Sequence, residues 1–420
     1  MSNKENDNRI REIQIISSKS DAHRAIICSG LAGGPEIQCY ETSVDIEATR
    51  DCMTSLCGEG NEAELRCRES GTTFRLLLPV VGALGKKGVF HPEGRLSKRP
   101  LSPLYEELEA HGMKLSPQGE VPFVTEGRLS AGDFEIPGDV SSQFISGLLL
   151  ALPLVEGESR VLVAGPLESA GYVNMTLATM DKFGVKVDIE ENPDIKGSAG
   201  KDISIVYKVR GGQKYTAPDS YQVDGDWSNG AFWLAAGILG DFPIKVKGLT
   251  RNSTQGDKAI VDVIKAFGGG IEVGDDFVTA YPSGGLLKGI EYDAGQTPDM
   301  IPVVALIATQ AQGETLIKNA GRLRIKESDR LNSISETLKA LGGDIDELED
   351  SLVIRGGEGL DGGKVDSFND HRIAMMAAIA SIVSKENVML TGSKAVAKSY
   401  PGFYDRLAEL GLEGNLKTEE

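Results

Sequence analysis

The 420-residue chain is poor in cysteine and histidine, and the few that it has are not arranged for metal binding. Its five cysteines all fall within the first 67 residues, an odd number that cannot all form disulfide pairs within one chain. They form no CxxC motif, and no histidine is spaced from them as in a zinc site. We therefore expect reduced thiols, as in a cytoplasmic protein, and no metal. No nucleotide-binding loop or flavin motif is present either, so we expect no cofactor.

Positive charge and long apolar runs are also scarce. Lysine and arginine number 44 against 62 acidic residues, a formal charge of −18, which argues against partners such as nucleic acid or an anionic membrane. The longest apolar run, 144–155, is only about half of the ~20 residues that a membrane span requires. The N-terminal MSNKENDNRIREI lacks the apolar stretch of a signal peptide, so no targeting segment is expected. Any anionic ligand must be bound by a local cluster of basic residues.

What is present is the composition of a folded α/β protein with an internal repeat. A content of 40% hydrophobic and 25% charged residues over 420 positions predicts a globular chain, with two domains as the first interpretation. A glycine that follows an amphipathic run recurs at spacings of 72, 84, 74 and 69 residues: Gly112, Gly184, Gly268, Gly342 and Gly411. This regularity predicts repeated units in which a second helix ends at a glycine.

Two of these second helices can be placed from their apolar spacing. In each, four apolar residues fall on one helical face: Ile260, Val263, Ile264 and Phe267 in one, Leu331, Ile334, Leu338 and Leu341 in the other. With an early degenerate unit at 22–67, the chain contains six units, three on each side of a polar stretch at 215–225. The pattern predicts two pseudo-symmetric lobes.

Small polar and basic residues gather where the repeated helices should begin. They are SSKSDAHR at 17–24, ESGTTFR at 69–75, DVSSQF at 139–144, IKESDR at 325–330 and NDHR at 369–372. Helix N-termini present unpaired N–H groups and attract phosphate or carboxylate, so several facing one cleft would bind anions. Each segment has a plainer explanation as an N-cap or as a solvated first turn with ion pairs. Those explanations do not account for Arg or Lys at the same position in successive repeats of an acidic chain.

Nine segments occur in the order and approximate spacing of one enzyme family. They are KSDAHR, SGTTFR, KRPLSPL, GDVSSQFISGLL, GDWSNGAF, PDM, KESDRL, NDHRIAM and AKSYPGF. In them the chain resembles the 5-enolpyruvylshikimate-3-phosphate synthases over nearly its whole length. The resemblance implies an α/β fold, a two-lobed inside-out α/β barrel of the enolpyruvyl transferase type with three βαβαββ repeats in each lobe. Residues 1–20 and 225–420 would form one lobe and 21–224 the other, with crossovers near 20 and 224.

The resemblance also implies an activity and its partners. Such enzymes are transferases of the shikimate pathway of aromatic amino acid biosynthesis. They move the enolpyruvyl group of phosphoenolpyruvate to the 5-hydroxyl of shikimate 3-phosphate, through a tetrahedral ketal, and release phosphate. Both substrates are anions, and arginine offers them a planar bidentate fork. A monomer is the family expectation.

Motif matching transfers the family's site residues to this sequence. The residues expected at phosphoenolpyruvate are Lys19, Gly71, Thr72, Arg99, Gln143, Arg330, Arg372 and Lys398. Those expected at shikimate 3-phosphate are Lys19, Ser20, Arg24, Ser141, Ser142, Gln143, Ser169, Tyr172, Asp299 and Lys326. The expected catalytic residues are Asp299 at the reacting hydroxyl, Glu327 at C3 of the enol, and Lys19 as a charge stabiliser. The lobe with 225–420 would then carry the phosphoenolpyruvate side and catalysis, and the other most shikimate 3-phosphate contacts.

Two rival functions stay open. The related UDP-N-acetylglucosamine enolpyruvyl transferase usually has a cysteine about five residues before the RP pair, whereas no cysteine occurs from Val89 to Pro100. A non-catalytic relative that only binds anionic metabolites would be expected to lack a carboxylate or a cation of the set. The required residues are all present, so catalysis is the favoured interpretation; they are Asp299, Glu327, Lys19 and Lys398.

Overall fold

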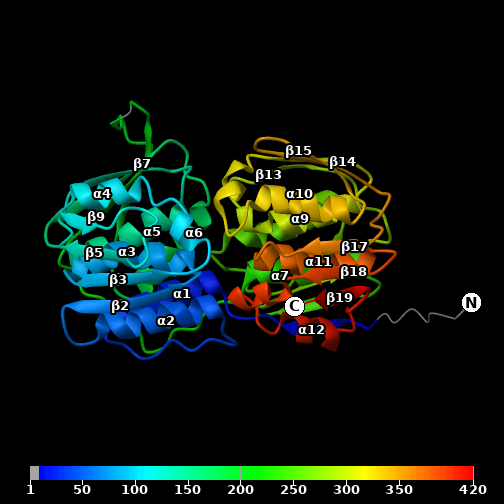
Figure 1. Cartoon of the computed structure of the whole chain (residues 1–420), viewed down its shortest axis with the longest axis horizontal. Coiled ribbons are helices and arrows are strands. Elements are labelled where there is room, and N and C mark those ends of the chain that lie inside the picture. The colour runs from blue at the N-terminus through cyan, green and yellow to red at the C-terminus, as the bar shows by residue number, and fades with distance from the viewer. Residues whose placement is uncertain (1–8, 199, 420) are drawn as a thin grey trace, which may run out of the picture. The chain divides into compact units, whose positions relative to one another are not determined.

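A computed structural model describes residues 9–198 and 200–419, and it divides the chain into two compact units. Unit 1 comprises Met1–Ser18, Glu41–Ser43 and Asp224–Glu420, and unit 2 comprises Lys19–Tyr40 and Val44–Val223. Figure 1 colours most of unit 1 from green to red and unit 2 from blue to green. The blue strand β1 (Arg11–Gln14) belongs to unit 1, because it pairs with β10 (Ile244–Lys247).

Unit 1 contains three sheets. The first has the order β1, β10, β12 (Phe277–Tyr281) and β11 (Gly270–Val273). The second has the order β13 (Glu291–Asp293), β14 (Gly313–Lys318), β16 (Leu352–Gly356) and β15 (Asp344–Glu347). The third, β17 (Gly363–Asp366), β18 (Val388–Thr391) and β19 (Leu416–Glu419), is parallel throughout.

Unit 2 repeats the four-stranded plan twice. One sheet has the order β2 (Glu62–Arg68), β3 (Lys87–Pro92), β5 (Phe123–Gly127) and β4 (Met113–Leu115). The other has the order β6 (Asp133–Pro137), β7 (Glu158–Ala164), β9 (Ile203–Arg210) and β8 (Asp188–Glu191). In all four four-stranded sheets the first pair is parallel and the other two are antiparallel. The shared plan confirms the internal repeat. The early segment 22–67 supplies two helices and the strand β2, which joins the sheet of the next repeat.

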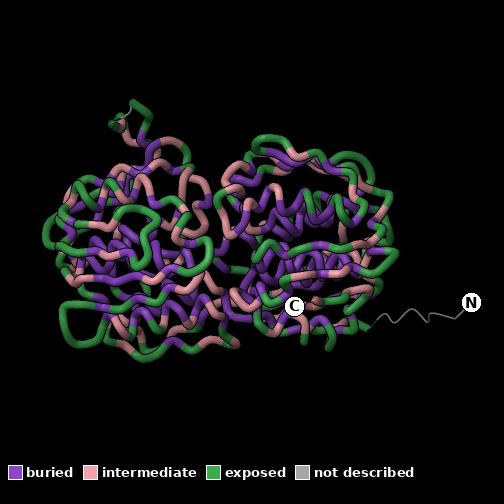
Figure 2. The backbone as a smooth tube through the Cα atoms, viewed as in Figure 1, coloured by how far each residue is buried: buried purple, intermediate pink, exposed green. Residues whose placement is uncertain are grey.

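The first helix of each repeat is mostly buried inside its unit, and all but α1 are predominantly apolar. These helices are α1 (Lys19–Ala32), α3 (Gly71–Leu84), α5 (Ser142–Ala151), α7 (Trp227–Leu239), α9 (Ile301–Thr309) and α11 (His371–Val383). All nine residues of α9 are buried, and α7, α9 and α11 contact one another. Figure 2 shows these helices as purple tube within each unit. An all-round apolar helix must be covered on every side, so the sheets lie outside the helices. This arrangement agrees with the inside-out α/β fold expected from the sequence.

The second helices are amphipathic, as predicted. They are α2 (Val44–Cys57), α4 (Leu104–Ala110), α6 (Ala170–Lys182), α8 (Ile260–Phe267), α10 (Arg330–Ala340) and α12 (Phe403–Glu409). The eight predicted apolar-face residues of the α8 and α10 repeats are at most 4% exposed. The five recurring glycines have φ between 59° and 98°, the left-handed region that a side chain rarely adopts. Both predictions are confirmed.

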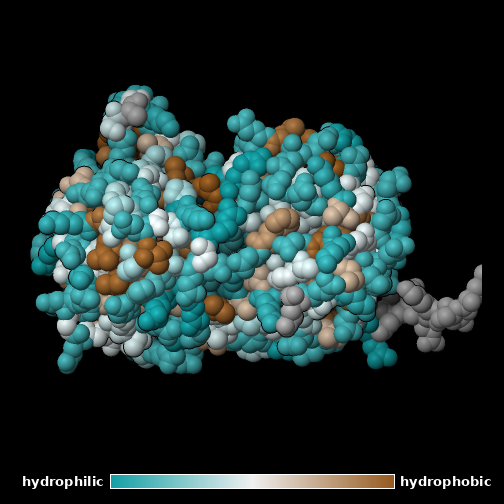
Figure 3. Space-filling view, viewed as in Figure 1, coloured by the Kyte–Doolittle hydropathy of each residue, from teal (hydrophilic) through white to brown (hydrophobic). Residues whose placement is uncertain are grey.

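Short 3₁₀ segments complete the described chain: η1 (Leu96–Lys98), η2 (Leu152–Leu154), η3 (Gly256–Ala259), η4 (Pro298–Met300), η5 (Gly321–Ile325) and η6 (Ser393–Lys398). Across residues 9–198 and 200–419, every helix is too short or too polar to cross a membrane. Hydrophilic side chains cover most of the face of each unit seen in Figure 3.

Candidate active site

The five polar segments lie at helix starts, as the sequence predicted. α1 begins at Lys19, and α3 begins at Gly71, whose N-cap Ser70 accepts a hydrogen bond from the Thr73 amide at 3.2 Å. The remaining three helices, α5, α10 and α11, have the N-caps Ser141, Asp329 and Asp370, each accepting a backbone N–H of the first turn. The capping explanation and the proposed anion-binding role are therefore compatible. Capping leaves other N–H groups of the first turn available.

A charged cluster in unit 1 is centred on Arg330, which is 1% exposed. Its Nη1 donates to Asp299 Oδ1 at 2.9 Å, and its Nε donates to Asp370 Oδ2 at the same distance. Its Nη2 forms an ion pair with Glu327, three residues earlier. The guanidinium thus joins the two carboxylates predicted to carry proton transfer, although they come from different elements.

Asp299 receives two further cations. Arg372 Nη2 lies 3.1 Å from Asp299 Oδ2, and Lys326 Nζ lies 3.7 Å from Asp299 Oδ1. The Asp299 side chain is still 20% exposed. Lys398, from the C-terminal end of η6, donates to the backbone carbonyl of Asn369 at 2.7 Å, one residue before the Asp370 cap. Unit 1 therefore brings its predicted site residues to one region.

Burial changes the protonation of this cluster. It lowers the pKa of Lys326 to about 8; the charges of Arg322 and Arg330 act in the same direction, and Asp299 opposes them. The pKa of Arg330 is raised, because the carboxylates of Asp370, Glu327 and Asp299 outweigh the effect of its burial. Arg330 is thus a permanent cation. Lys326 is a cation only below a mildly alkaline pH.

Asp257 is a buried carboxyl beside this cluster that the sequence did not identify. It is 2% exposed, its Oδ2 accepts a hydrogen bond from the Ser228 hydroxyl, and its Oδ1 has no hydrogen-bond partner among the described residues. Burial and the negative charge of Asp299 raise its pKa to about 6, while Arg372 opposes the shift. It lies in η3, just before α8, in a segment to which no role could be assigned from the sequence.

In unit 2, Lys19 is the first residue of α1 and is paired with a residue that the sequence did not single out. Its Nζ lies 2.9 Å from Asp45 Oδ2 on α2, with side-chain exposures of 13% and 9%. Five residues further along α1 lies Arg24, which is 1% exposed. Lys19 and Arg24 therefore both lie on α1, which packs against α2 and α6.

Arg24 is held by protein groups on all sides. It donates to Thr176 Oγ1 at 2.6 Å, to the Ser20 carbonyl at 2.6 Å and to the Tyr172 carbonyl at 3.0 Å. Burial lowers its pKa to about 10, a value at which it still carries its charge at neutral pH. Ser169, the N-cap of α6, is 1% exposed and has a φ of 54°. Arg24, Ser20, Tyr172 and Ser169 thus lie around the junction of α1 and α6.

The loop before α3 is packed against a second arginine. A Cβ placed on Gly71 would lie 2.5 Å from Arg99 Nη1, so the backbone there approaches the guanidinium as closely as only glycine allows. Thr72 Oγ1 accepts a hydrogen bond from Gln143 Nε2 at 2.9 Å, and Gln143 Oε1 accepts one from Arg75 Nη1 at 3.0 Å. Four predicted residues of the phosphoenolpyruvate set are thereby collected in unit 2.

Arg75 is the main omission from this group. It follows Gly71 by one helical turn and also donates to the Pro100 carbonyl at 3.1 Å, which links α3 to the loop of Arg99. Arg75 lies within the segment ESGTTFR, but its partners could not be inferred from the sequence. Asp370 was likewise inside NDHR without an assigned role, although it is 0% exposed and bonded to Arg330.

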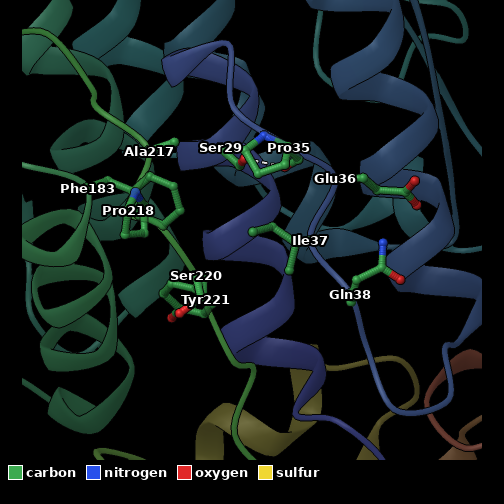
Figure 4. A pocket seen from close by; sticks show the side chains of 10 residues that line it. All are labelled: Ser29, Pro35, Glu36, Ile37, Gln38, Phe183, Ala217, Pro218, Ser220 and Tyr221. Carbon is green, nitrogen blue, oxygen red and sulfur yellow. Dashed lines mark hydrogen bonds between the residues drawn. The ribbon is translucent and has the colours of Figure 1, made fainter.

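A hollow of about 200 Å³ in unit 2 is separate from these clusters (Figure 4). Its lining includes Ser29, Pro35, Phe183, Pro218 and Tyr221, and none of the predicted site residues takes part. In the part of the chain that the structure describes, no group of three or more His, Cys, Asp or Glu is placed to hold a metal ion.

Comparison with known proteins gives consistent matches. A family model described as EPSP synthase (3-phosphoshikimate 1-carboxyvinyltransferase) matches residues 57–407. The 3-phosphoshikimate 1-carboxyvinyltransferase of Clostridium novyi is 41% identical, with 95% of each chain covered. The enzyme of the same name from Clostridium kluyveri is 39% identical, with 96% of this chain and 95% of the relative covered.

Two solved structures share the fold. An EPSP synthase from Acinetobacter baumannii superimposes with a TM-score of 0.72 at 23% identity, covering 96% of this chain and 97% of that one. The enolpyruvyl transferase NikO from Streptomyces tendae gives a TM-score of 0.73 at 16% identity, with 96% of each chain covered. These likenesses confirm the two-lobed enolpyruvyl transferase fold.

Proposed function

The chain belongs to the EPSP synthase (3-phosphoshikimate 1-carboxyvinyltransferase) family, and from this premise we propose that it transfers the enolpyruvyl group of phosphoenolpyruvate to the 5-hydroxyl of shikimate 3-phosphate. The observation that carries the proposal is the cluster of Asp299, Glu327 and Arg330, because a chain that merely bound metabolites would not need two carboxylates held beside one buried arginine. The activity places the protein in aromatic amino acid biosynthesis.

Charge is the first requirement of this reaction. Two anionic substrates repel each other, and fixed cations remove that barrier more effectively than water does because they need no reorganisation. In unit 1 we assign Arg330, Arg372 and Lys398 to phosphoenolpyruvate and Lys326 to shikimate 3-phosphate. In unit 2 we assign five residues to the binding of phosphoenolpyruvate: Lys19, Gly71, Thr72, Arg99 and Gln143. The unit 2 residues assigned to shikimate 3-phosphate, two of them shared with phosphoenolpyruvate, are Lys19, Ser20, Arg24, Ser141, Ser142, Gln143, Ser169 and Tyr172.

Proton transfer is the second requirement. In the addition step the 5-oxygen attacks C2 of the enol, Asp299 takes the hydroxyl proton, and Glu327 gives a proton to C3. In the elimination step the Glu327 carboxylate takes a proton back from C3, the double bond forms again, and phosphate leaves with the electron pair of its C–O bond. Arg330 contacts both carboxylates, which fixes their separation, and Lys19 stabilises the developing charge.

The remaining expectations are part of the same proposal. The lobe of 1–20 and 225–420 supplies catalysis and the phosphoenolpyruvate side, and the lobe of 21–224 supplies most contacts to shikimate 3-phosphate. The protein works in the cytoplasm as a monomer without a cofactor. The five cysteines are all free thiols, which supports a reducing compartment.

Released phosphate tests the activity directly. The purified chain is incubated with phosphoenolpyruvate and either shikimate 3-phosphate or UDP-N-acetylglucosamine, and phosphate is measured. Release with shikimate 3-phosphate alone supports the proposal, release with the sugar nucleotide supports the rival transferase, and no release supports a binding protein.

A carboxylate variant tests the mechanism. Glu327→Gln should lower kcat far more than it changes either KM, because the amide keeps the shape but cannot deliver the proton. Glu336→Gln is the matched control, since Glu336 is exposed on α10. Unchanged turnover in Glu327→Gln would refute the assigned role.

A further inference from the structure

Four buried side chains of unit 2 form a continuous line of hydrogen bonds from α1 through α2 to the start of α3. His23 Nδ1 lies 2.5 Å from Thr49 Oγ1, Thr49 Oγ1 lies 2.6 Å from Thr73 Oγ1, and Thr73 Oγ1 lies 2.7 Å from Ser70 Oγ. None of the four residues is more than 1% exposed. Because water does not reach the line, its protons must be shared among these groups alone.

The direction of each hydrogen bond follows from counting protons. Thr73 donates its single hydroxyl proton to Ser70 Oγ, so in the bond between the two threonines Thr49 must be the donor. Thr49 then has no proton left for His23, and His23 Nδ1 must donate to Thr49 Oγ1. The imidazole is therefore protonated on Nδ1. Its Nε2 is buried and has no hydrogen-bond partner among the described residues.

The charges around His23 agree with a neutral ring. Burial lowers the pKa of His23 well below its ordinary value, and the cations Lys19 and Arg24 on the same helix act in the same direction. The neighbouring helix α2 presents Asp45, but that carboxylate is already paired with Lys19 at 2.9 Å. A third cation in this part of α1 would be opposed by the other two.

Both ends of the line carry residues assigned to phosphoenolpyruvate. Lys19 lies one helical turn before His23 on α1, and Ser70 is the N-cap that directly precedes Gly71 and Thr72. We propose that His23, Thr49 and Thr73 are positioning residues that fix the Gly71–Thr72 loop relative to Lys19, with His23 kept as the neutral tautomer protonated on Nδ1. The positioning part rests on the proposed function, whereas the tautomer does not.

The tautomer is tested without substrate. The whole chain is labelled with ¹⁵N at histidine, and the His23 signals are assigned by their loss in His23→Gln. We expect a protonated Nδ1 and an unprotonated Nε2 that stay unchanged from about pH 6 to 9, since a ring with a depressed pKa does not titrate there. Thr49→Val removes the acceptor and should abolish this pattern. A wild-type ring protonated on Nε2, or one that titrates in this range, overturns the inference whatever the activity.

Kinetics test the positioning. Thr49→Val should raise the KM for phosphoenolpyruvate about five- to tenfold, the range of one lost hydrogen bond, with kcat and the KM for shikimate 3-phosphate nearly unchanged. Thr49→Ser keeps a hydroxyl and should restore the wild-type KM. The control is Thr54→Val, because Thr54 is exposed on α2 and its hydroxyl donates to the Arg50 carbonyl of the same helix at 2.9 Å.

A second variant covers the case in which Thr49→Val does not fold. Thr73→Val removes the hydroxyl that bonds both Thr49 and Ser70, leaves the bond between His23 and Thr49 in place, and should give the same selective rise in KM. Equal losses in kcat and both substrate affinities, or a Thr49→Val variant that behaves like Thr54→Val, would overturn the positioning role.

Discussion

Arg330 and Asp370 form a two-pronged ion pair inside unit 1, with Nε 2.9 Å from Oδ2 and Nη2 3.2 Å from Oδ1. Asp370 also accepts the Arg372 amide at 2.9 Å as the N-cap of α11. One carboxylate thus orients the guanidinium that contacts Asp299 and Glu327, and at the same time fixes the helix that carries Arg372. The positions of Arg330 and Arg372 therefore both depend on the buried carboxylate of Asp370.

Removing the Asp370 carboxylate should lower the free energy of unfolding substantially. Asp370→Ala leaves Arg330 charged and 1% exposed without its main partner, and we expect a loss of about 3–5 kcal/mol in the free energy of unfolding. Asp361→Ala is the control, because its pair with Lys385 has the same kind of contact at 2.9 Å but side-chain exposures of 69% and 64%. That exposed pair should contribute less than about 1 kcal/mol. Urea unfolding of the whole chain measures both, and equal losses would contradict the prediction.

The protonation of Lys326 should set an alkaline limit on substrate capture. Its pKa of about 8 means that the free enzyme loses this cation as the pH rises through that value. We expect kcat/KM for shikimate 3-phosphate to fall above about pH 8, because that ratio reports the free enzyme. Lys326→Arg keeps a cation at every accessible pH and should move the fall to higher pH. The pH profiles of the two proteins decide the point, and superimposable profiles would rule Lys326 out.

Asp257 should make the folded state less stable as the pH rises. Its folded pKa of about 6 lies above the ordinary value of 3.8, so its favourable contribution is complete below that ordinary value and is lost as the pH rises through 6. Two units correspond to about 3 kcal/mol. Relative to wild type, Asp257→Asn should therefore gain up to about 3 kcal/mol of unfolding free energy between pH 4 and 8.

Denaturant unfolding at the two pH values measures this difference. Asp262→Asn is the control, since Asp262 lies nearby on α8 with its side chain 86% exposed and should show no such change. A constant difference between Asp257→Asn and wild type at both pH values would show that the carboxyl is not buried as described.

Local features of the chain were predictable because their cause is local. Gly268 and Gly342 end helices in the left-handed region, and any sequence with that spacing and those apolar faces must stop there. The helix starts followed in the same way from Ser and Asp caps. Arg330 and Asp299, in contrast, lie 31 residues apart, and only the resemblance to a family placed them together.

Partners of the site residues were not predictable, because tertiary packing alone brings them close. Asp45 reads as an ordinary acidic residue in the first turn of α2 until α1 places Lys19 against it. Thr49 reads as a weak helix former, yet its hydroxyl joins α1 to α3. Asp257 reads as part of a turn. In each case one side chain acts on a residue of another element, and no periodicity records that pairing.

Gly71 supplies a test of how closely a site residue must be packed. Its φ is not positive, so alanine fits the backbone, but the added Cβ would lie 2.5 Å from Arg99 Nη1. The arginine tip can move aside, so we expect a change in unfolding free energy within about 0.5 kcal/mol. The KM for phosphoenolpyruvate should rise about tenfold, a loss of about 1.4 kcal/mol of binding, because Arg99 no longer points where the anion binds.

The matched control is Gly402→Ala at the start of α12, where the nearest atom to an added Cβ is Glu41 Oε2 at an ordinary 3.5 Å. It should leave both KM values and the stability unchanged. Steady-state kinetics with each substrate varied in turn, together with urea unfolding, separates a displaced arginine from a damaged fold. A Gly71→Ala enzyme with the wild-type KM for phosphoenolpyruvate would mean that this contact does not position Arg99. The loop before α3 would then cap the helix without contributing to phosphoenolpyruvate binding.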